Sequence, residues 1–419
     1  MVKSTYLPLD ERTQLASQPA IAFGAIGLAA LIVLIGAALS FSGGEAIDLG
    51  EGRFSRTSLS DFMASYLINF WFLLTLGLGG LFFTMVQHLT RAGWSATVRR
   101  TAEFLAASLI PTSLLFIPIA IVVLMRDGTL YPWTDPELVA HDPLLEWKEP
   151  YLNVFWFLVR AVAYIAVWVF LAWRFVGQSL KQDETGDFRI TYHLQSLAAP
   201  AMFLFGLTLT FAAVDWIMTL APVWFSTMWG VYLFAGTMVS TCAALILLVS
   251  LLHQFGKLRG IVNVEHTHDL SKLLFGFIVF WGYIAFSQYM LIWYANIPEE
   301  TFWYRFRQEN EGWVTISAIL LVGHLLLPLP LLLRRSLRRN AAYMTIWAVF
   351  MLIMHWIDLY WMIAPQFRPE APYPGVMDFA LLLAAVAYLA GFLFFMMGRY
   401  PLAPLKDPRL HEALAFKNL

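Results

Sequence analysis

The chain has 419 residues, of which 59% are hydrophobic and only 13% are charged, and its formal net charge is −1. A soluble domain is about one quarter charged, so this chain has too little charge to cover a water-exposed surface, and we predict an integral membrane protein. The small net charge argues against a nucleic-acid partner. The single cysteine, Cys242, excludes an internal disulfide, a cysteine-held Fe–S cluster and a CxxCH haem attachment within this chain.

Ten apolar segments are each long enough to cross a bilayer, which takes about 20 helical residues. The first has a long leader that contains acidic residues and no clean cleavage site, so we expect a true helix rather than a signal peptide. The sequence therefore predicts an all-α integral membrane fold, a single polytopic domain over residues 1–419. The predicted helices lie near residues 21–42, 61–89, 102–125, 151–176, 194–220, 227–253, 270–295, 313–333, 341–364 and 377–398.

The distribution of basic residues predicts the orientation. Most of the 27 Lys and Arg residues lie in the N-terminal segment, in the C-terminal segment and in the loops between helices 2 and 3, 4 and 5, 6 and 7, and 8 and 9. The densest cluster is RRSLRR at 334–339. Because cytoplasmic loops carry the excess of Lys and Arg, we expect both termini in the cytoplasm. Prolines in the tail over 399–419 prevent a helix in its first half; an extended arm on a neighbour and a disordered tail both remain open.

Two connections on the predicted outer side are long, aromatic and charged. They cover residues 126–150 and 296–312. Docking of an extracytoplasmic partner would explain them. The alternative is an aromatic belt at the membrane surface with ordinary solvated charges.

Polar residues within spans are the candidates for chemistry, because a charge in hydrocarbon is costly and needs a reason. Asp215 lies in the stretch FAAVDWIMTLAPVWFSTMWGVY, and Arg160 has no acid in its own span, so we expect these two to pair. The pair is either structural or the outer end of a proton path. On the ninth helix, His355 and Asp358 share a face, which suits proton handling or a structural hydrogen bond. With Tyr232 they complete the predicted outer half-path.

A second polar set is expected toward the cytoplasm. Lys272 can pair with Asp269, and Glu103 with Arg99 or Arg100, so each also has an ordinary structural explanation. No span holds two histidines, which disfavours a bound haem b. The predicted inner half-path comprises Lys272, His253, His324, Glu103 and His88, and the residues that could bridge the two halves are Gln288, Tyr289, Ser287 and Tyr283.

Three stretches carry a resemblance to a known family. They are LAPVWFSTMWGVYLFAG within Asp215–Gly236, HDLSKLLFGFIVFWGYIAFSQYMLIWYANIPEE over His268–Glu300, and PLAPLKDPRLHEAL in the tail. Together they cover about a sixth of the chain and resemble the NrfD-like (polysulfide-reductase-like) integral subunits of alternative complex III, a bacterial quinol:electron-acceptor oxidoreductase. The match is closest to the smaller of its two such subunits.

The resemblance implies an architecture and a setting. The fold would be two four-helix bundles, helices 2–5 and 6–9, with helices 1 and 10 peripheral. The location would be the bacterial inner membrane. Partners would be a second NrfD-like subunit, a periplasmic Fe–S subunit of molybdopterin-enzyme ancestry, multihaem and monohaem cytochromes c, small membrane subunits and lipid. The Fe–S clusters and haem c would belong to those partners; this chain would bind no cofactor, although quinol is possible.

Three functions follow for consideration. The first is a respiratory-complex subunit that carries no redox centre itself and provides a proton half-channel. The second is that this chain itself binds quinol and deprotonates it with Asp215 or His355. The third is a stand-alone secondary transporter, for which broken helices around a central site would be the expected sign.

Overall fold

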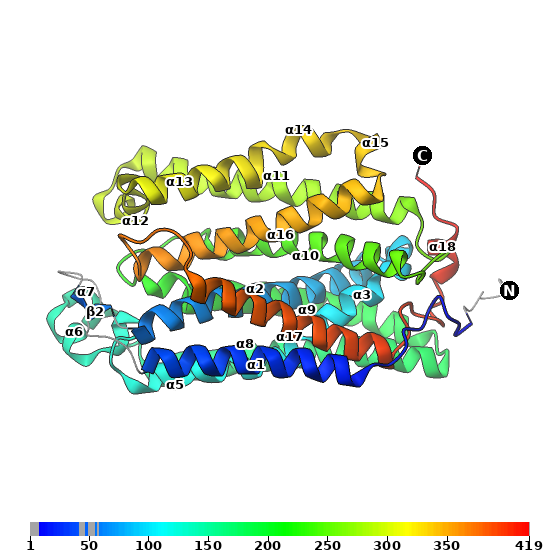
Figure 1. Cartoon of the computed structure of the whole chain (residues 1–419), viewed down its shortest axis with the longest axis horizontal. Coiled ribbons are helices and arrows are strands. Elements are labelled where there is room, and N and C mark those ends of the chain that lie inside the picture. Colours follow the sequence, from blue (N-terminus) through cyan, green and yellow to red (C-terminus); the bar gives the residue numbers. More distant parts are fainter. Residues whose placement is uncertain (1–7, 42–46, 49–54, 57, 419) are drawn as a thin grey trace.

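The computed structural model describes residues 8–41, 47–48, 55–56 and 58–418 and confirms the all-α membrane fold. Within these ranges, ten helical spans are long and apolar enough to cross a membrane, and Figure 1 shows them running along one common axis. The only strands in the described part are β1 (Ile47–Asp48) and β2 (Ser55–Arg56), which form one short antiparallel pair. In chain order the spans are α1 (Pro19–Phe41); α2 (Ser58–Leu89); η1 (Gly93–Ser95), α3 (Ala96–Ala107), α4 (Leu109–Thr112), η2 (Ser113–Phe116) and α5 (Ile117–Met125) together; α8 (Val154–Thr185); α9 (Arg189–Trp216) with η4 (Met218–Leu220); α10 (Trp229–Gln254); α11 (Val264–Ala295); α13 (Glu311–Leu320), η5 (Leu321–Leu326) and α14 (Pro328–Leu333) together; α16 (Ala341–Ile363) with η6 (Ala364–Gln366); and α17 (Val376–Arg399).

The spans form the two predicted four-helix bundles. The first contains α2, the α3–α5 span, α8 and α9, and the second contains α10, α11, the α13–α14 span and α16. The two bundles meet where α2 packs against α10 and α16. Helices α1 and α17 pack against each other at the periphery, and α17 also contacts α2. Helix α2 is therefore the central element and is buried over nearly its whole length.

Glycines allow the close packing of α2. A Cβ on Gly80 would lie 2.7 Å from the backbone oxygen of Ala102, and one on Gly79 would lie 1.8 Å from Thr241 Oγ1. Only glycine permits these approaches to α3 and α10, because helix backbones in membranes come together where side chains are small.

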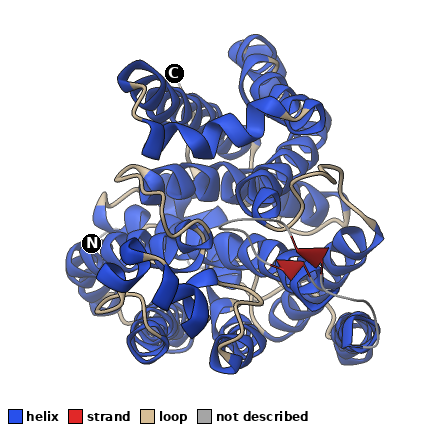
Figure 2. Cartoon of the chain, turned by 90° about the vertical axis from the view of Figure 1, so that its left-hand side faces the viewer, coloured by secondary structure: helices blue, strands red, loops and turns tan. Residues whose placement is uncertain are grey.

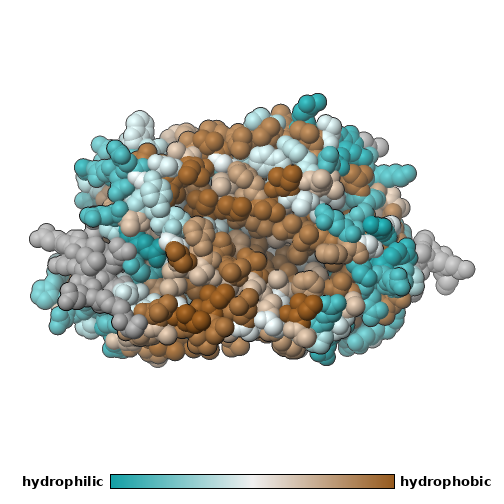
Figure 3. All heavy atoms as spheres, viewed as in Figure 1, coloured by the Kyte–Doolittle hydropathy of each residue, from teal (hydrophilic) through white to brown (hydrophobic). Residues whose placement is uncertain are grey.

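The two ends of the molecule differ. One end carries both described chain termini and α15 (Arg335–Arg338) on the right of Figure 1, and we call it the terminal end. The opposite end carries α6 (Pro136–His141), α7 (Pro143–Lys148) and α12 (Pro298–Glu309), and we call it the loop end; Figure 2 views it directly. Between them Figure 3 shows a hydrophobic band with hydrophilic residues gathered at both ends, as a membrane protein requires.

Two spans change helix type in their interior and not only at an end. The third span breaks after Ala107 and changes to 3₁₀ geometry at η2, near Pro111 and Pro118, because proline removes a backbone donor and clashes with the preceding turn. The eighth contains the π-helical segment η5 just before Pro328. Such π segments occur frequently at functional sites.

Several helices extend further than the sequence predicted. Helix α3 begins at Ala96 rather than near 102, α8 continues to Thr185 rather than 176, and α11 begins at Val264 rather than 270. Arg99 and Arg100 therefore lie inside a helix and are buried. The difference has a physical cause: charged residues interrupt the apolar runs in the sequence, whereas the fold continues the helices through them and pairs them with one another.

The tail over residues 400–418 is ordered against the rest of the chain. Backbone N–H of Leu402 donates to Thr13 O at 2.8 Å, and the short helix α18 (Leu410–Leu414) packs on η1 and α3. Its first part is non-helical, as the prolines predicted. The alternative of a disordered tail was wrong for these residues, and the surface that the arm covers belongs to this chain.

Candidate functional site

Asp215 forms the predicted ion pair with Arg160. Arg160 Nε on α8 donates to Asp215 Oδ2 on α9 at 2.7 Å, and its Nη2 lies 3.3 Å from Oδ1. The hydroxyl of Tyr164 donates to the same Oδ2 at 2.9 Å. Asp215 is fully buried, whereas the Arg160 side chain keeps 18% exposure. The negative charge of Asp215 is therefore fully compensated inside the first bundle.

Tyr151 covers this pair from the loop end. The Arg160 guanidinium lies over its ring, 3.8 Å from the centroid, and Arg160 Nη1 donates to its backbone oxygen at 3.0 Å. Burial raises the pKa of Tyr151 to about 12, and the charge of Asp215 adds to the effect. The phenol therefore stays protonated and can act as a hydrogen-bond donor beside the carboxylate.

Asp358 forms a different kind of site in the second bundle. Tyr232 donates to its Oδ1 and Trp281 Nε1 donates to its Oδ2 at 3.0 Å. The residue is buried, and among the described residues no Lys or Arg makes an ion pair with it. Asp358 therefore lies among neutral hydrogen-bond donors, and the described residues supply it with no fixed counter-charge, in contrast to Asp215.

His355 extends this site toward the first bundle. Its Nε2 lies 3.0 Å from Thr75 Oγ1 on α2, and its Nδ1 has no hydrogen-bond partner in the described part of the chain. Gly236 on α10 lies against both residues of the predicted pair, since a Cβ there would be 3.2 Å from His355 Nδ1 and 3.5 Å from Asp358 Oδ2. We call Asp358, His355, Tyr232, Trp281 and Thr75 the Asp358 cluster.

His324 lies beside the Asp358 cluster and not with the inner set to which the sequence assigned it. Its ring stacks on Trp281 with centroids 3.9 Å apart, and neither ring nitrogen has a partner among the described residues. The cause is its position in the π-helical segment η5, which directs the ring into the second bundle. The predicted outer half-path thus divides between the bundles, with Asp215 and Arg160 in one and His355, Asp358 and Tyr232 in the other.

The remaining inner-set residues lie in three places at the terminal end. Glu103 pairs with both arginines that the sequence offered, Arg99 at 3.2 Å and Arg100 at 3.0 Å. His88 lies near Arg99 and is buried, and its Nε2 has no partner among the described residues. Lys272 pairs with Asp269 on the half-exposed surface of α11, and His253 is exposed at the end of α10. Among the described residues, no side-chain hydrogen bond joins these three places.

The four predicted bridging residues do not connect the two halves. Gln288 accepts from Ser226 Oγ at 2.9 Å and donates to the Tyr304 hydroxyl at 2.7 Å, which places it near the loop end. The hydroxyl of Tyr289 accepts from Gln308 there at 2.9 Å. Tyr283 is 64% exposed on the outer face of α11, and Ser287, one turn further on, is partly buried. Tyr283, Ser287 and Tyr289 do not share the face on which Trp281 contacts Asp358. Gln288 does share that face, two turns further along α11, but its partners there are Ser226 and Tyr304.

Sequence reasoning missed a buried ion cluster at the loop end. Arg368, which follows η6, binds Asp378 on α17 at 2.6 Å and Asp61 on α2 at 3.2 Å. Ser65 donates to Asp378 at 2.6 Å. The two acids are in the first turns of their helices, where a carboxylate is favourable on its own, so their position in the sequence does not reveal the shared arginine. The cluster ties α17 to α2.

Arg307 on α12 was also missed as a buried residue. It donates to the backbone oxygens of Trp303 at 2.7 Å and of Trp361 and Met362 at 3.2 Å each, and its guanidinium lies 3.4 Å from the centroid of a Trp303 ring. Burial lowers the pKa of Arg307 well below its usual value. The last carbonyls of α16 lack helical partners, so Arg307 satisfies them and fixes α12 on the second bundle.

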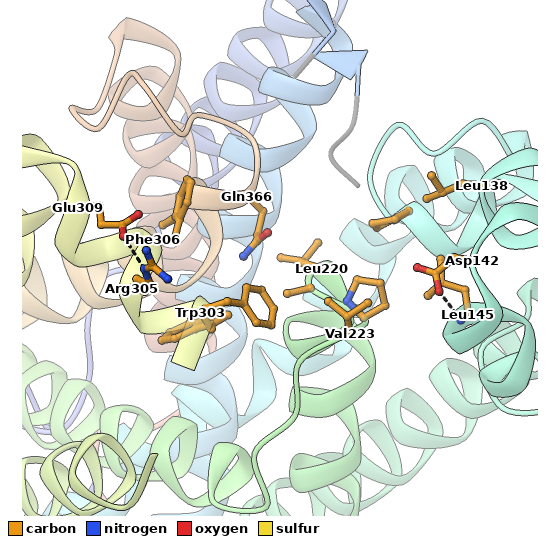
Figure 4. A pocket seen from close by; sticks show the side chains of 15 residues that line it. Leu138, Asp142, Leu145, Leu220, Val223, Trp303, Arg305, Phe306, Glu309 and Gln366 are labelled. Carbon is orange, nitrogen blue, oxygen red and sulfur yellow. Dashed lines mark hydrogen bonds and ion pairs between the residues drawn. The ribbon is translucent and has the colours of Figure 1, made fainter. Parts of the chain in front are cut away.

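Two hollows lie side by side at the loop end. Figure 4 shows the first, of about 420 Å³, between Arg305, Phe306 and Glu309 of α12 on one side and the α6–α7 segment on the other. The second, of about 810 Å³, is mostly apolar. They share a wall formed by Pro222, Val223 and Phe302. The second hollow is lined by aromatic residues that include Trp147, Tyr151, Trp224 and Phe225.

Within the described residues, no three His, Cys, Asp or Glu side chains gather closely enough to hold a metal ion. Comparison with known proteins gave no family: no protein-family model matches the chain, and no curated protein matches it.

Proposed function

We propose that this chain is an integral membrane subunit of a bacterial respiratory quinol oxidoreductase related to alternative complex III, in which it carries protons rather than electrons. The sequence support is the set of three stretches that resemble the NrfD-like subunits. The structural support is the Asp358 cluster, in which a buried carboxyl group has hydrogen-bond donors but, in the described part of the chain, no cation. Ionisable residues within membrane spans are functional candidates by default, and no ion pair among the described residues explains this one.

The Asp358 cluster suits proton transfer for three reasons. The carboxyl group of Asp358 can bind or release a proton without breaking an ion pair. His355 offers a second titratable group, and its free Nδ1 faces Gly236, next to Asp358. Thr75 continues the chain of polar groups onto α2. In this proposal Asp215 has a mainly structural role, because Arg160 and Tyr164 already hold its charge.

The proposal also includes an orientation in the membrane and a side on which the partner subunits dock. The two described chain termini and the basic helix α15 share one end of the molecule, which by the positive-inside rule is the cytoplasmic end. The loop end, with its two hollows, then faces the periplasm, where the Fe–S subunit and the cytochromes c would dock. The Fe–S clusters and haem c belong to those partners, and a second NrfD-like subunit lies beside this chain in the membrane.

Isolation through an affinity tag on this chain tests the assignment. The expected result is co-purification of c-type haem, visible in reduced-minus-oxidised spectra, together with an Fe–S subunit and quinol oxidation. Purification of the chain alone, without haem and from otherwise intact membranes, would overturn the assignment and favour a transporter.

A second candidate function is that this chain binds quinol itself. It is favoured by one observation, the hollow of about 810 Å³ with an aromatic lining that includes Tyr151, which contacts Arg160. Largely apolar cavities with a few polar groups are typical ligand sites. A photoreactive quinone decides the matter: crosslinks to residues 144–152 or 218–225 support this function, and crosslinks confined to the second NrfD-like subunit exclude it.

A further inference from the structure

Five charged side chains form a buried network at the terminal end of the first bundle. Arg99 and Arg100 on α3 contact Glu103 at 3.2 and 3.0 Å, and Arg100 Nη2 donates to Asp183 on α8 at 2.7 Å. Arg99 also binds Asp407 of the tail. Each of these side chains is at most 7% exposed. We call Arg99, Arg100, Glu103, Asp183 and Asp407 the terminal-end ion cluster.

The tail both completes and covers this cluster. Asp407 is 2% exposed although it belongs to the tail. On one side of it, the Lys406 ammonium donates to Glu184 O at 2.6 Å, which fixes the tail on α8. On the other side, Leu410 and Ala413 of α18 are fully buried against Ala96 of α3. The tail is thus held at both sides of Asp407, and its carboxylate is placed on Arg99.

The charges of the cluster do not balance. It contains three carboxyl groups and two guanidinium groups, so one negative charge is left over when all five are ionised. An uncompensated charge away from water is costly. One bound proton would remove the excess. Without Asp407 the cluster would contain two groups of each sign and would have no such excess.

Unpartnered polar atoms next to the cluster indicate bound water. Arg100 Nη1, His88 Nε2 and Thr97 Oγ1 are buried and have no hydrogen-bond partner among the described residues. Buried polar atoms in folded proteins nearly always have a partner, and ordered water supplies it where the protein does not. His88 lies near Arg99, so unpartnered polar groups lie on and beside the cluster.

We propose that the terminal-end ion cluster is a proton-holding site, and that the tail supplies its third carboxylate and closes it toward the aqueous side. The charged and titratable groups around it are His88 from α2, Arg99, Arg100 and Glu103 from α3, Asp183 from α8, and Asp407 with the outer Lys406 from the tail. This inference rests on the proposed function for its purpose, since a held proton serves translocation, but not for its chemistry.

Infrared difference spectroscopy on the purified full-length protein in lipid nanodiscs tests the proposal. A protonated buried carboxyl group gives a C=O stretch that is separate from carboxylate bands. The expected result is a band that titrates with pH in the wild type and is lost in Asp407→Asn, because two carboxylates then balance two guanidiniums. Carboxyl groups elsewhere are common to both proteins and cancel in the difference.

The controls separate this site from folding defects. Glu412→Gln changes a tail carboxylate that pairs with Arg409 outside the cluster, so it should retain the band. If Asp407→Asn does not fold, Asp183→Asn offers the same change in charge from α8. Identical spectra for the wild type and the folded cluster variants would overturn the proposal. Loss of the band in a protein that lacks associated haem would sustain this inference and reject the respiratory function.

Discussion

Thr75 Oγ1 on α2 lies 3.0 Å from His355 Nε2 on α16 and forms a hydrogen bond between the two bundles, as does Asn69 Oδ1, which accepts from Trp356 Nε1 at 3.0 Å. Thr75 also lies 3.0 Å from Phe72 O, an acceptor that can receive its single hydroxyl proton. In that arrangement His355 Nε2 carries hydrogen and donates to Thr75, because a neutral imidazole has one donor and one acceptor nitrogen. Nδ1 is then the free acceptor that faces Gly236.

Replacement of Thr75 by valine should destabilise the protein and slow proton transfer. The change preserves shape but leaves His355 Nε2 without a partner, and an unsatisfied buried polar group costs about 1–3 kcal/mol. Thr84→Val is the matched control, since Thr84 on the same helix is equally buried and donates only to Gly80 O within its own helix. Thermal unfolding in detergent should rank Thr75→Val below Thr84→Val. Equal melting temperatures would show that the inter-bundle bond is unimportant.

Asp358→Asn should lower proton transfer but retain stability, whereas Asp215→Asn should lower stability. Asparagine at 358 can accept from Trp281 and donate to the Tyr232 oxygen, so folding should be retained while proton transfer per electron falls. Asparagine at 215 leaves Arg160 without its counter-ion. Breaking a fully buried pair costs about 3–5 kcal/mol, and the partial exposure of Arg160 makes a smaller loss the expectation.

Melting temperature and proton-to-electron ratio, measured on the same preparations, distinguish these outcomes. Arg160→Gln combined with Asp215→Asn should recover part of the stability that Asp215→Asn loses, because no uncompensated charge remains. Normal proton transfer in Asp358→Asn would contradict the role assigned to this carboxyl group.

Gly80→Ala should be the most damaging glycine substitution in α2. Its Cβ would lie 2.7 Å from Ala102 O and 2.9 Å from Ala106 N. Both contacts are with backbone atoms that cannot rotate away, and overpacking of this kind costs about 1–3 kcal/mol. Gly276→Ala on α11 meets no atom within 4 Å and should be neutral or slightly stabilising. Similar melting temperatures for the two variants would argue against close α2–α3 packing.

The fold was largely predictable from the sequence, whereas the grouping of the polar residues was not. Hydropathy alone gives the ten spans, because only long helices satisfy their backbone polar groups in lipid. Arg160 and Asp215 could be paired because each lacked a partner on its own helix. His324 was assigned to the wrong polar set because no sequence pattern predicts the π-helical segment that turns its ring toward Trp281. Asp407 was missed because its burial depends on the tail folding back over more than 300 residues of chain.

Tyr304→Phe should reduce the loss of stability at alkaline pH. Burial raises the pKa of Tyr304 from 10.0 to about 12. Between these values the unfolded chain has released the phenol proton while the folded protein still holds it, so stability falls as pH rises through this window. Melting temperatures of wild type and variant at neutral pH and across pH 10 to 12 test this. The difference between the two proteins should shrink as pH rises; a constant difference would contradict the assignment.

Removal of the tail should expose η1 at the terminal end. Ser95 in η1 is fully buried, and η1 packs against α18. A Ser95→Cys substitution is nearly isosteric, and the native Cys242 is buried, so a water-soluble maleimide reports on the new thiol. We expect Ser95→Cys to be protected in the full-length protein and to react after deletion of residues 400–419.

Asp407→Asn should give intermediate labelling, because it removes the charge that holds the tail on Arg99 while leaving Leu410 and Ala413 in place. Thr90→Cys, at an exposed position on the same connection, should react in every background and thereby control for reagent access. Equal labelling of Ser95→Cys with and without the tail would show that the tail does not close this end of the bundle.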